Sequence, residues 1–395
     1  MNKQHTIAIT SFGAPRVGGW IGDVSQAGVE SSRYLDAASA EPLHPAARES
    51  LLAALDVGYA DPRRLHHPAR NARLLLDNAR AVVAESLGVR ADEVTFTGSG
   101  TEAVHRGLLG LVRAEPGATI VHGDVEHSAV LHAAAWSGRP TRVLPVDRLG
   151  RVDTTGLGPD AGPRVVAVQA ANHEVGTVQH LTAPPAGAAV FVDACASMGR
   201  LPLPPHWAAL AGSAHKWGGP AGVGVLLVRH RAPWLTPFPA DDRADPRASG
   251  FENVPGALAA AAALQAVVAE RDEVNARQHA LVDRIRAAAA AVDDVDVVGD
   301  PVDRLPHLVT FSVLYVNGER LVTELDRRGF GVASGSACTA STLEPSRVLA
   351  AMGALTHGNV RLSVGPATTD AEVDRLLAEL PGLVQRLRDE SGVPR

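Results

Sequence analysis

One lysine of this chain stands in a setting that suits covalent chemistry. The chain has 37 lysines and arginines among its 395 residues, and only Lys3 and Lys216 are lysines. Lys216 lies beside His215 in the Gly- and Pro-rich run 212–220. Lysine and arginine are equivalent on a solvated surface, but only lysine can lose its proton and attack a carbonyl. We therefore expect Lys216 to form a Schiff base with an aldehyde cofactor. A genome that favours arginine codons explains why lysine is rare, but not why Lys216 sits in this turn.

Asp193 stands at the carboxyl end of an apolar strand pattern, in the run 190–193. A buried carboxylate there would pair with the nitrogen of a pyridine ring and keep that nitrogen protonated. The ring could then absorb the electrons of a carbanion. The alternative is an aspartate that only caps the turn after the strand.

A glycine-rich turn offers a place for an anion. Residues 98–101 read Gly-Ser-Gly-Thr, between an expected strand and an expected helix. Small residues such as Gly100 let backbone N–H groups approach an anion, and the start of a helix favours negative charge. Many α/β proteins have such a turn for steric reasons alone, so the turn does not identify an anion site by itself.

His127 lies in the run 126–130, at the expected start of another helix. A histidine there would stack on a cofactor ring and move protons. It would equally well cap the helix, and the sequence leaves both interpretations open.

The two cysteines differ in their surroundings. Cys338 lies among the small residues of 333–342, where no apolar face exists. Structural cysteines are usually buried among apolar neighbours, so we expect Cys338 to be an exposed nucleophilic thiol on a loop. Cys195 follows a buried strand between two alanines, and we expect it to be a small core residue.

Arg361 alternates with apolar residues in the run 359–363. Its guanidinium would bind a substrate carboxylate through two hydrogen bonds. For this residue taken alone, an arginine on the solvent-facing side of a strand is the simpler explanation.

The composition limits the classes of function. With 37 basic and 43 acidic residues the formal net charge is −6, which argues against a dedicated nucleic-acid surface. No apolar run is long enough to span a bilayer, and residues 1–32 lack the apolar block of a signal peptide. Two cysteines and scattered histidines provide no metal-ligand pattern. We therefore expect a cytoplasmic protein without a membrane partner, a nucleic-acid partner or a protein-held metal.

Short apolar strands alternate with amphipathic helices from about residue 34 onward. This alternation predicts an α/β fold with a mostly parallel, helix-covered sheet. The expected elements are strands at 94–97, 119–122, 142–146, 165–169, 190–193 and 223–228, a helix at 74–87 that stops at Gly88, and a helix that ends near 112.

The pattern of expected helices and strands changes after the turn at 253–256. A helical pattern over about 257–291 leads into a second region, and its last helix opens with a capping box formed by Thr369 and Glu372. The other elements expected there are strands at 295–298, 307–313 and 360–364 and a helix at 319–328. We expect three parts: a poorly ordered extension at 1–32, a large domain at 33–255 whose first residues can pack on the small domain, and a small α+β domain at 256–395 that carries the Cys338 loop.

Taken together, these segments resemble the cysteine desulfurases, which are pyridoxal-phosphate enzymes of aminotransferase class V. The resemblance runs from about residue 34 to 387, in order and at family-like spacing. Its most specific part is Ser-Gly-Ser-Ala-Cys at 334–338 followed by Glu-Pro-Ser at 344–346, which is similar to the long loop of the group that serves iron–sulfur assembly and tRNA thiolation. The other matching segments are 34–38, 96–102, 126–131, 172–176, 192–194, 213–216 and 361–363.

The resemblance implies fold type I, with a mostly parallel seven-stranded sheet in the large domain, and pyridoxal 5'-phosphate as cofactor. It implies that L-cysteine is converted to L-alanine, with the sulfur passed to Cys338 as a persulfide and then to an acceptor protein. It also implies a homodimer. The residue roles that it implies are the Schiff base and proton transfer for Lys216, the ring nitrogen for Asp193, ring stacking for His127, the phosphate for Gly100, Thr101, Ser213 and His215, and the substrate carboxylate for Arg361.

Three positions depart from the family pattern. His173 stands where the family usually has an asparagine that contacts the cofactor's ring oxygen, and Ala196 stands where a glutamine shares that contact. Phe251 replaces a threonine that reaches the cofactor phosphate of the partner subunit. His173 can donate a hydrogen bond, so we expect it to bind the cofactor and to lie near the substrate.

Two alternatives to desulfuration remain open at the level of the sequence. The first is another class V enzyme, such as a selenocysteine lyase, a C–S lyase or an aminotransferase, that does not use Cys338. The changes at His173 and Ala196 motivate it. The second is a sulfur-relay or scaffold protein that no longer binds the cofactor, which Phe251 motivates.

Overall fold

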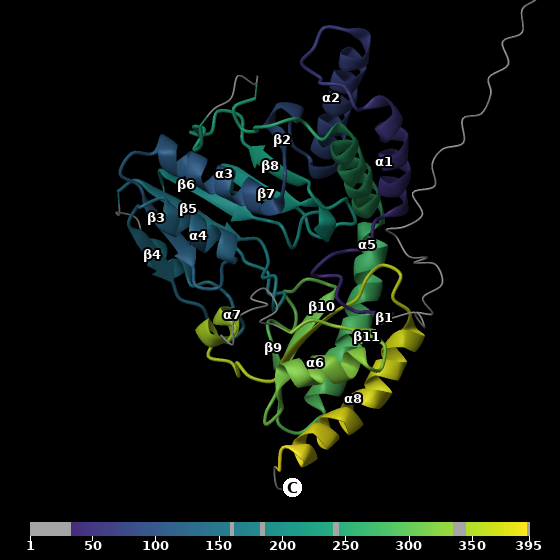
Figure 1. Ribbon diagram of the computed structural model, residues 1–395. Helices are drawn as coiled ribbons and strands as arrows, with labels where there is room; N and C mark the ends of the chain where they lie inside the picture. The colour runs from purple at the N-terminus through teal and green to yellow at the C-terminus, as the bar shows by residue number, and fades with distance from the viewer. Residues whose placement is uncertain (1–32, 159–161, 182–185, 240–244, 335–344, 393–395) are drawn as a thin grey trace, which may run out of the picture. The chain divides into compact units, whose positions relative to one another are not determined.

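The computed structural model describes residues 33–158, 162–181, 186–239, 245–334 and 345–392 (Figure 1). The extension 1–32 and Cys338 therefore lie outside the described residues. Arg33–Arg395 group together as one compact unit. Among the described helices, none has both the length and the apolar character needed to cross a bilayer.

The strands between residues 94 and 228 form a seven-stranded sheet in the order β2-β8-β7-β6-β5-β3-β4 (Figure 1). Strands β4, β3, β5, β6 and β7 are parallel, and β8 runs antiparallel to both β7 and β2. This mostly parallel sheet confirms the fold class expected from the sequence. The strands are β2 Val94–Thr97, β3 Thr119–Gly123, β4 Thr141–Leu144, β5 Arg164–Gln169, β6 Ala188–Asp193, β7 Ala209–Ser213 and β8 Gly224–Val228.

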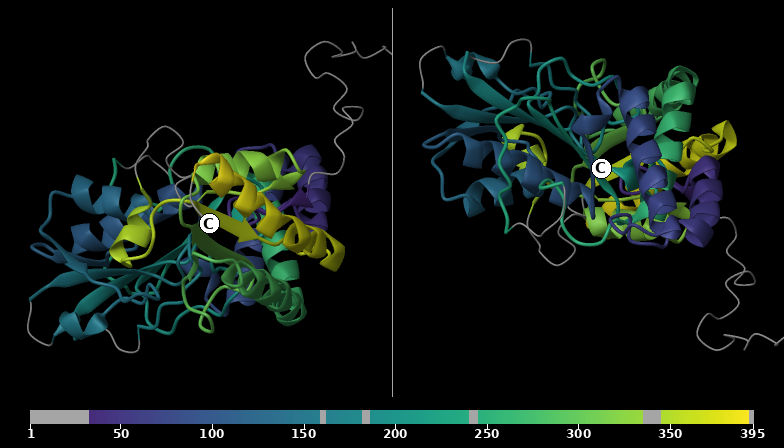
Figure 2. Two further views of the ribbon diagram at one scale, coloured as in Figure 1. Left: turned by 90° about the horizontal axis from the view of Figure 1, so that it is seen from below. Right: turned by 90° about the horizontal axis from the view of Figure 1, so that it is seen from above.

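Helices cover both faces of this sheet because successive strand residues point to opposite sides. Val165 and Ala167 of β5 pack in one apolar cluster with α3 and α4, while Val166 and Val168 pack in another with α2 and α5. In both views of Figure 2, α1 and α5 remain side by side, in keeping with their extensive contacts. The helices are α1 Pro45–Val57, α2 His67–Leu87, α3 Gly100–Ala114, α4 Ser128–Trp136 and α5 Val254–Ala290.

Helix α5 joins two apolar clusters. Its first turns, through Leu264, pack under the seven-stranded sheet. Its later residues, among them Leu281 and Ile285, pack with the three-stranded antiparallel sheet β12-β10-β9. The remaining elements are β1 Arg33–Tyr34 paired with β11 Phe330–Gly331, β9 Val295–Val298, β10 Leu308–Val313, α6 Gly318–Asp326, α7 Arg347–Ala351, β12 Asn359–Ser363 and α8 Asp370–Glu390.

Local sequence signals set several element ends where they were expected. Helix α2 stops at Gly88, which adopts a left-handed conformation with φ of 66° that glycine accommodates without strain. Helix α8 starts at the expected capping box, in which Thr369 and Glu372 satisfy each other's backbone N–H groups. Strand β7 was missed, because Ala209–Ser213 consists of four small residues and one leucine, without a strand-like pattern.

The parallel strands end at one edge of the sheet, and this edge collects the chemical groups. In β5 and β6, Gln169 pairs in register with Asp193. Strand β7 continues the same direction and ends at Ser213, directly before the turn that contains Lys216. Residues far apart in the sequence therefore meet at this edge, as in other α/β sheets.

Candidate functional site

A cavity of about 350 Å³ lies at the carboxyl edge of the seven-stranded sheet. It is lined by every site residue predicted from the sequence that lies in the described part of the chain. The lining residues are Ser39, Gly100, Thr101, Val104, His127, Ala129, Gln169, Ala171, His173, Asp193, Cys195, Ala196, Ser213, His215, Lys216 and Arg361.

Lys216 sits in a single 3-10 turn, Ala214–Lys216, that follows β7. Trp217, the residue after this turn, holds it in place. Its buried ring donates from Nε1 to the carbonyl of Ala260 on α5 at 3.1 Å. The Lys216 ammonium donates to the carbonyl of Ala38 at 2.5 Å. The amine and its turn are therefore fixed at the cavity wall by hydrogen bonds to two distant segments.

The start of α3 lies almost in contact with the end of β7. A methyl group at Gly100 would lie 2.6 Å from Cβ of Ser213 and 3.2 Å from Sγ of Cys195, so only glycine fits. The Ser99 hydroxyl caps the helix by accepting the N–H of Glu102 at 3.0 Å. This close approach places the positive end of the α3 dipole next to the hydroxyl of Ser213 at the cavity.

These features fit pyridoxal phosphate. The α3 terminus with its glycine cradle suits a phosphate ester, and the hydroxyl of Ser213 lies 3.1 Å from Nδ1 of His215, both on the cavity wall. An amine and a carboxylate, Lys216 and Asp193, line the same cavity. A cavity of about 350 Å³ is within the usual size of a small-molecule site.

Asp193 caps a turn and also lines the cavity. Its Oδ1 accepts the N–H of Cys195 at 2.9 Å, so the carboxylate does cap the turn after β6. It is also 6% exposed and lines the cavity. The cap orients the carboxylate and leaves Oδ2 without a hydrogen bond to the backbone of that turn.

His127 likewise caps a helix and lines the cavity. Its Nδ1 accepts the N–H of Ala129 at 3.1 Å, which places the proton of the neutral ring on Nε2. Its ring lies edge to face against that of His173, with centroids 4.9 Å apart. Burial, together with the nearby Lys216 charge, lowers the pKa of His127 despite the opposing effect of Asp193.

His173 is neutral in this setting. Burial lowers its pKa well below the usual range, and His127, Arg361 and Lys216 act in the same direction. Its Nε2 lies 3.8 Å from Oε1 of Glu174, but a neutral imidazole makes no ion pair there. The residue can therefore offer a neutral donor or acceptor to a ligand in the cavity.

Arg361 is buried at 5% exposure, so the interpretation of a solvent-facing arginine is wrong. Its Nη2 donates to Asp36 at 3.0 Å and to Ser39 at 2.5 Å, and its Nη1 donates to the carbonyl of His173 at 3.0 Å. Its buried Nε has no hydrogen-bond partner among the described residues. The guanidinium is held rigidly and keeps a donor that a carboxylate ligand could use after a small shift.

Among the lining residues with a polar side chain, sequence reasoning missed three. Gln169 could have been found, because it ends the strand next to that of Asp193. Cys195 does pack against the apolar cluster of α3 as expected, but it also lines the cavity. Ser39 had no local signal, since its partner Arg361 lies 322 residues away.

The positions that depart from the family pattern have different surroundings. His173 and Ala196 both line the cavity, and Ala196 contributes no polar group. Phe251 is 59% exposed in the single chain.

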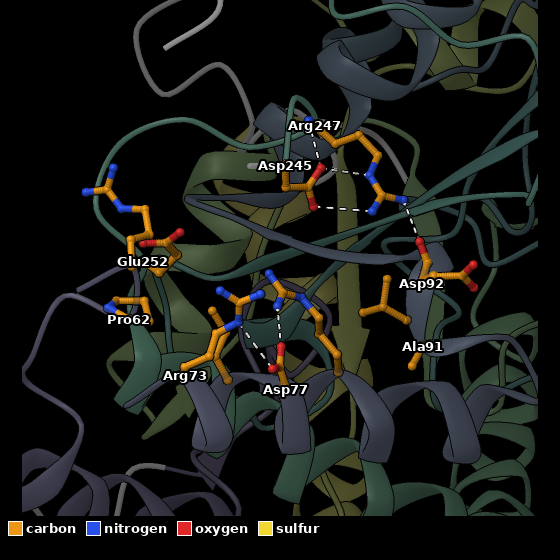
Figure 3. Close-up of a pocket in the computed structure, with 12 residues that line it drawn as sticks. Pro62, Arg73, Asp77, Ala91, Asp92, Asp245, Arg247 and Glu252 are labelled. Carbon is orange, nitrogen blue, oxygen red and sulfur yellow. Dashed lines mark hydrogen bonds and ion pairs between the residues drawn. The ribbon is translucent and has the colours of Figure 1, made fainter. Parts of the chain in front are cut away.

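A second pocket, of about 400 Å³, lies between α2, the segment before β2 and residues 245–252 (Figure 3). Its arginines are matched by carboxylates: Arg73 pairs with Asp77, and Arg247 with Asp245 (Figure 3). Its twelve described lining residues include no lysine, cysteine or histidine. The cavity around Lys216 is therefore the better candidate for chemistry.

Comparisons with known proteins give the relatives of this chain. The family model of the class V aminotransferases matches residues 33–376. An IscS-like cysteine desulfurase of Mycobacterium tuberculosis is 35% identical, over 90% of this chain and 97% of its own length. A cysteine desulfurase IscS of Dictyoglomus turgidum is 32% identical, over 90% and 95%. The solved structure of a NifS-like protein superposes with a TM-score of 0.82 at 26% identity, covering 90% of this chain and 99% of that one.

Glu174, next to His173, provides a test of the buried electrostatics. Burial raises the pKa of Glu174 to about 7, against the opposing effects of a hydrogen bond from Ser346 and of Arg361. The folded-state pKa is thus above the unfolded one, near 4.5. Its contribution to stability is present in full below pH 4.5 and is lost as the pH rises through 7.

We expect the wild type to lose about 2 kcal/mol of unfolding free energy relative to Glu174→Gln between pH 5 and pH 7.5. The glutamine does not titrate, and the depressed histidine pKa values affect both proteins equally. Urea unfolding at both pH values measures the difference. Parallel pH profiles of the two proteins would show that Glu174 is not a buried titrating group.

Proposed function

Because this chain belongs to the cysteine desulfurase family of the class V aminotransferases, we propose that it removes the sulfur of L-cysteine at the cavity around Lys216. Enzymes of this family depend on pyridoxal 5'-phosphate. The observation that carries the proposal is the meeting of Lys216, Asp193 and the α3 terminus at one cavity.

Pyridoxal phosphate supplies an electron sink that stabilises negative charge at the α-carbon of a bound amino acid. In the proposed site Lys216 would hold the cofactor covalently, and its amine would move the α-proton of the substrate. Asp193 would keep the ring nitrogen protonated, and His127 would stack on the ring. The phosphate would be held by Gly100, Thr101, Ser213 and His215.

Arg361 binds the carboxylate of L-cysteine in this proposal. Its bonds to Asp36, Ser39 and the His173 carbonyl fix the guanidinium plane before the substrate arrives. Such preorganisation lowers the entropic cost of holding the substrate in a reactive orientation. His173, being neutral, would add a hydrogen bond to the ring oxygen without adding charge beside Lys216.

The sulfur goes to Cys338, which lies outside the described residues. The Cys338 thiolate attacks the substrate sulfur, so a sulfur–sulfur bond forms while the bond from sulfur to the β-carbon breaks. The electron pair of that bond and one proton end on the β-carbon. The products are L-alanine and a persulfide on Cys338, which an acceptor protein consumes in iron–sulfur cluster assembly or in thiolation of tRNA or a cofactor.

We also propose the division into a large domain at 33–255 and a small domain at 256–395. Two separate groups of apolar residues support it, one around the seven-stranded sheet and one around the three-stranded sheet, with α5 shared between them. The cavity would then lie where Arg361 of the second region meets the cofactor residues of the first.

We expect Cys338→Ser to lose sulfur transfer, to below about 1% of the wild-type rate, since the nucleophile is gone. Cys195→Ser is the matched control, because these are the two cysteines of the chain. After L-cysteine is added without reductant, intact mass and peptide mapping should find one extra sulfur on Cys338 in the wild type and in Cys195→Ser. An extra sulfur on Cys338→Ser, or turnover of another amino acid at full rate in that variant, would instead favour a class V enzyme that does not use this thiol.

A homodimer is the further expectation. Large apolar side chains of the α1–α2 region are exposed in the single chain, in keeping with an interface. They include Leu52, Leu55, Leu65 and Leu74. Light scattering after size exclusion should give twice the chain mass of 41.1 kDa, and Leu55→Arg should shift the protein toward the monomer without unfolding it. A wild-type monomer at micromolar concentration would contradict the proposal.

A further inference from the structure

The chain on either side of residues 335–344, which include Cys338, is hydrogen-bonded to residues that line the cavity or adjoin its lining. On the amino-terminal side, Ala333 exchanges two backbone hydrogen bonds with Arg361, at 3.2 and 2.7 Å. On the carboxyl-terminal side, the hydroxyl of Ser346 donates to Oε2 of Glu174 at 2.6 Å. Arg361 lines the cavity, and Glu174 directly follows the lining residue His173.

Ser346 is the N-cap of α7, the helix that follows this segment among the described residues. Its hydroxyl accepts the N–H of Leu349 at 3.2 Å as the N-cap of α7, while it donates to Glu174. Ser346 is 4% exposed and Glu174 is 7% exposed. The hydrogen bond between them is therefore shielded from water, and it links residues 172 positions apart.

Glu174 is itself held in place at its backbone. Its N–H donates to Oδ1 of Asn172 at 2.8 Å, and its carbonyl accepts the hydroxyl of Thr310 at 2.6 Å. The backbone of Glu174 is thus held on both sides of the side chain that accepts the Ser346 hydroxyl.

Apolar packing supports the same attachment. Val348 and Leu349 of α7 share a small cluster with Val125 and Val175, which neighbour the cavity segments 126–127 and 173–174. The ion pair between Arg347 and Asp124 at 2.9 Å is half-exposed and contributes little.

The cap alone does not explain the buried carboxylate. A serine hydroxyl caps a short helix without help, as the N-cap role of Ser346 shows. Burying Glu174 is unfavourable, and its raised pKa reflects that penalty. A contact that is kept against such a penalty, beside the cavity, points to a role beyond the stability of five-residue α7.

The number of residues between Cys338 and each anchor limits where its thiol can lie. Cys338 lies five residues after Ala333 and eight residues before Ser346. A fully extended chain spans about 17 Å and about 27 Å over those distances. The two anchors therefore limit how far the Cys338 thiol can be from the cavity, and they raise its effective concentration there.

We propose that Glu174 is a positioning residue for sulfur transfer, which acts by holding Ser346 and so fixes the carboxyl-terminal anchor of the Cys338 segment at the cavity wall. The proposal rests on the function proposed above. It predicts that loss of the anchor slows the attack by Cys338 but leaves binding of L-cysteine at the cofactor intact.

Two readouts on the cofactor-loaded full chain separate these steps. The absorbance change of the bound cofactor on addition of L-cysteine reports substrate binding, and quenched-flow mass spectrometry reports the single-turnover rate of persulfide formation on Cys338. In both Ser346→Ala and Glu174→Ala, we expect the absorbance change to keep its amplitude and midpoint. The rate of persulfide formation should fall about ten-fold in each variant. Glu174→Gln should stay within about three-fold of wild type, because its amide oxygen still accepts the Ser346 hydroxyl.

Thr369→Ala is the matched control for loss of a cap. Thr369 also caps a helix and donates to a glutamate, Glu372, but it does so at the exposed start of α8. It should lose a similar cap stability with an unchanged persulfide rate. The double variant of Glu174→Ala with Ser346→Ala should be no slower than either single variant, since both remove one contact.

Three results would overturn the proposal: an unchanged persulfide rate in Ser346→Ala, an equal loss in Thr369→Ala, or a parallel loss of L-cysteine binding in the Glu174 variants. If the wild type itself formed no persulfide, the proposed function would fail instead. The two failures are therefore distinguishable.

Discussion

The contact between Gly100 and Ser213 is the constraint on which the site depends. Any side chain at Gly100 would collide with Ser213, and any side chain at Gly224 would lie 2.2 Å from the carbonyl oxygen of Ser99. These two glycines let α3 begin directly against β7 and β8. The positive end of the helix then faces the turn that presents Lys216, and the other strand ends complete the cavity around them.

The charges of the cavity follow from this arrangement. Its lining carries two cationic side chains, Lys216 and Arg361, together with the helix terminus, while Asp193 supplies the buried negative charge. His127 and His173 stay neutral because burial disfavours further positive charge next to the lysine. The cavity therefore suits a ligand with a phosphate, a carboxylate and a ring nitrogen that takes a proton, as the family's cofactor and substrate together provide.

Local signals in the sequence were sufficient for much of the fold and the site. Asp193, which ends the apolar strand β6, could be placed at the sheet edge because parallel strands end together. Lys216 was singled out by its residue type and its Gly- and Pro-rich run, and not by the strand before it. The resemblance to the desulfurases added the phosphate-binding role expected for Thr101, Ser213 and His215. What could not be predicted depends on contacts between distant segments. Ser39 beside Arg361, and Glu174 beside Ser346, become neighbours only when the chain has folded.

The central claim is that Lys216 carries the cofactor, and the chain is well suited to testing it because Lys3 is its one other lysine. The purified protein should be incubated with pyridoxal phosphate, reduced with borohydride, digested and mapped by mass spectrometry. We predict one cofactor per chain, attached to the peptide that contains Lys216. A protein that retains no cofactor, or that carries it on Lys3 or elsewhere, would contradict the assignment of this cavity as the active site.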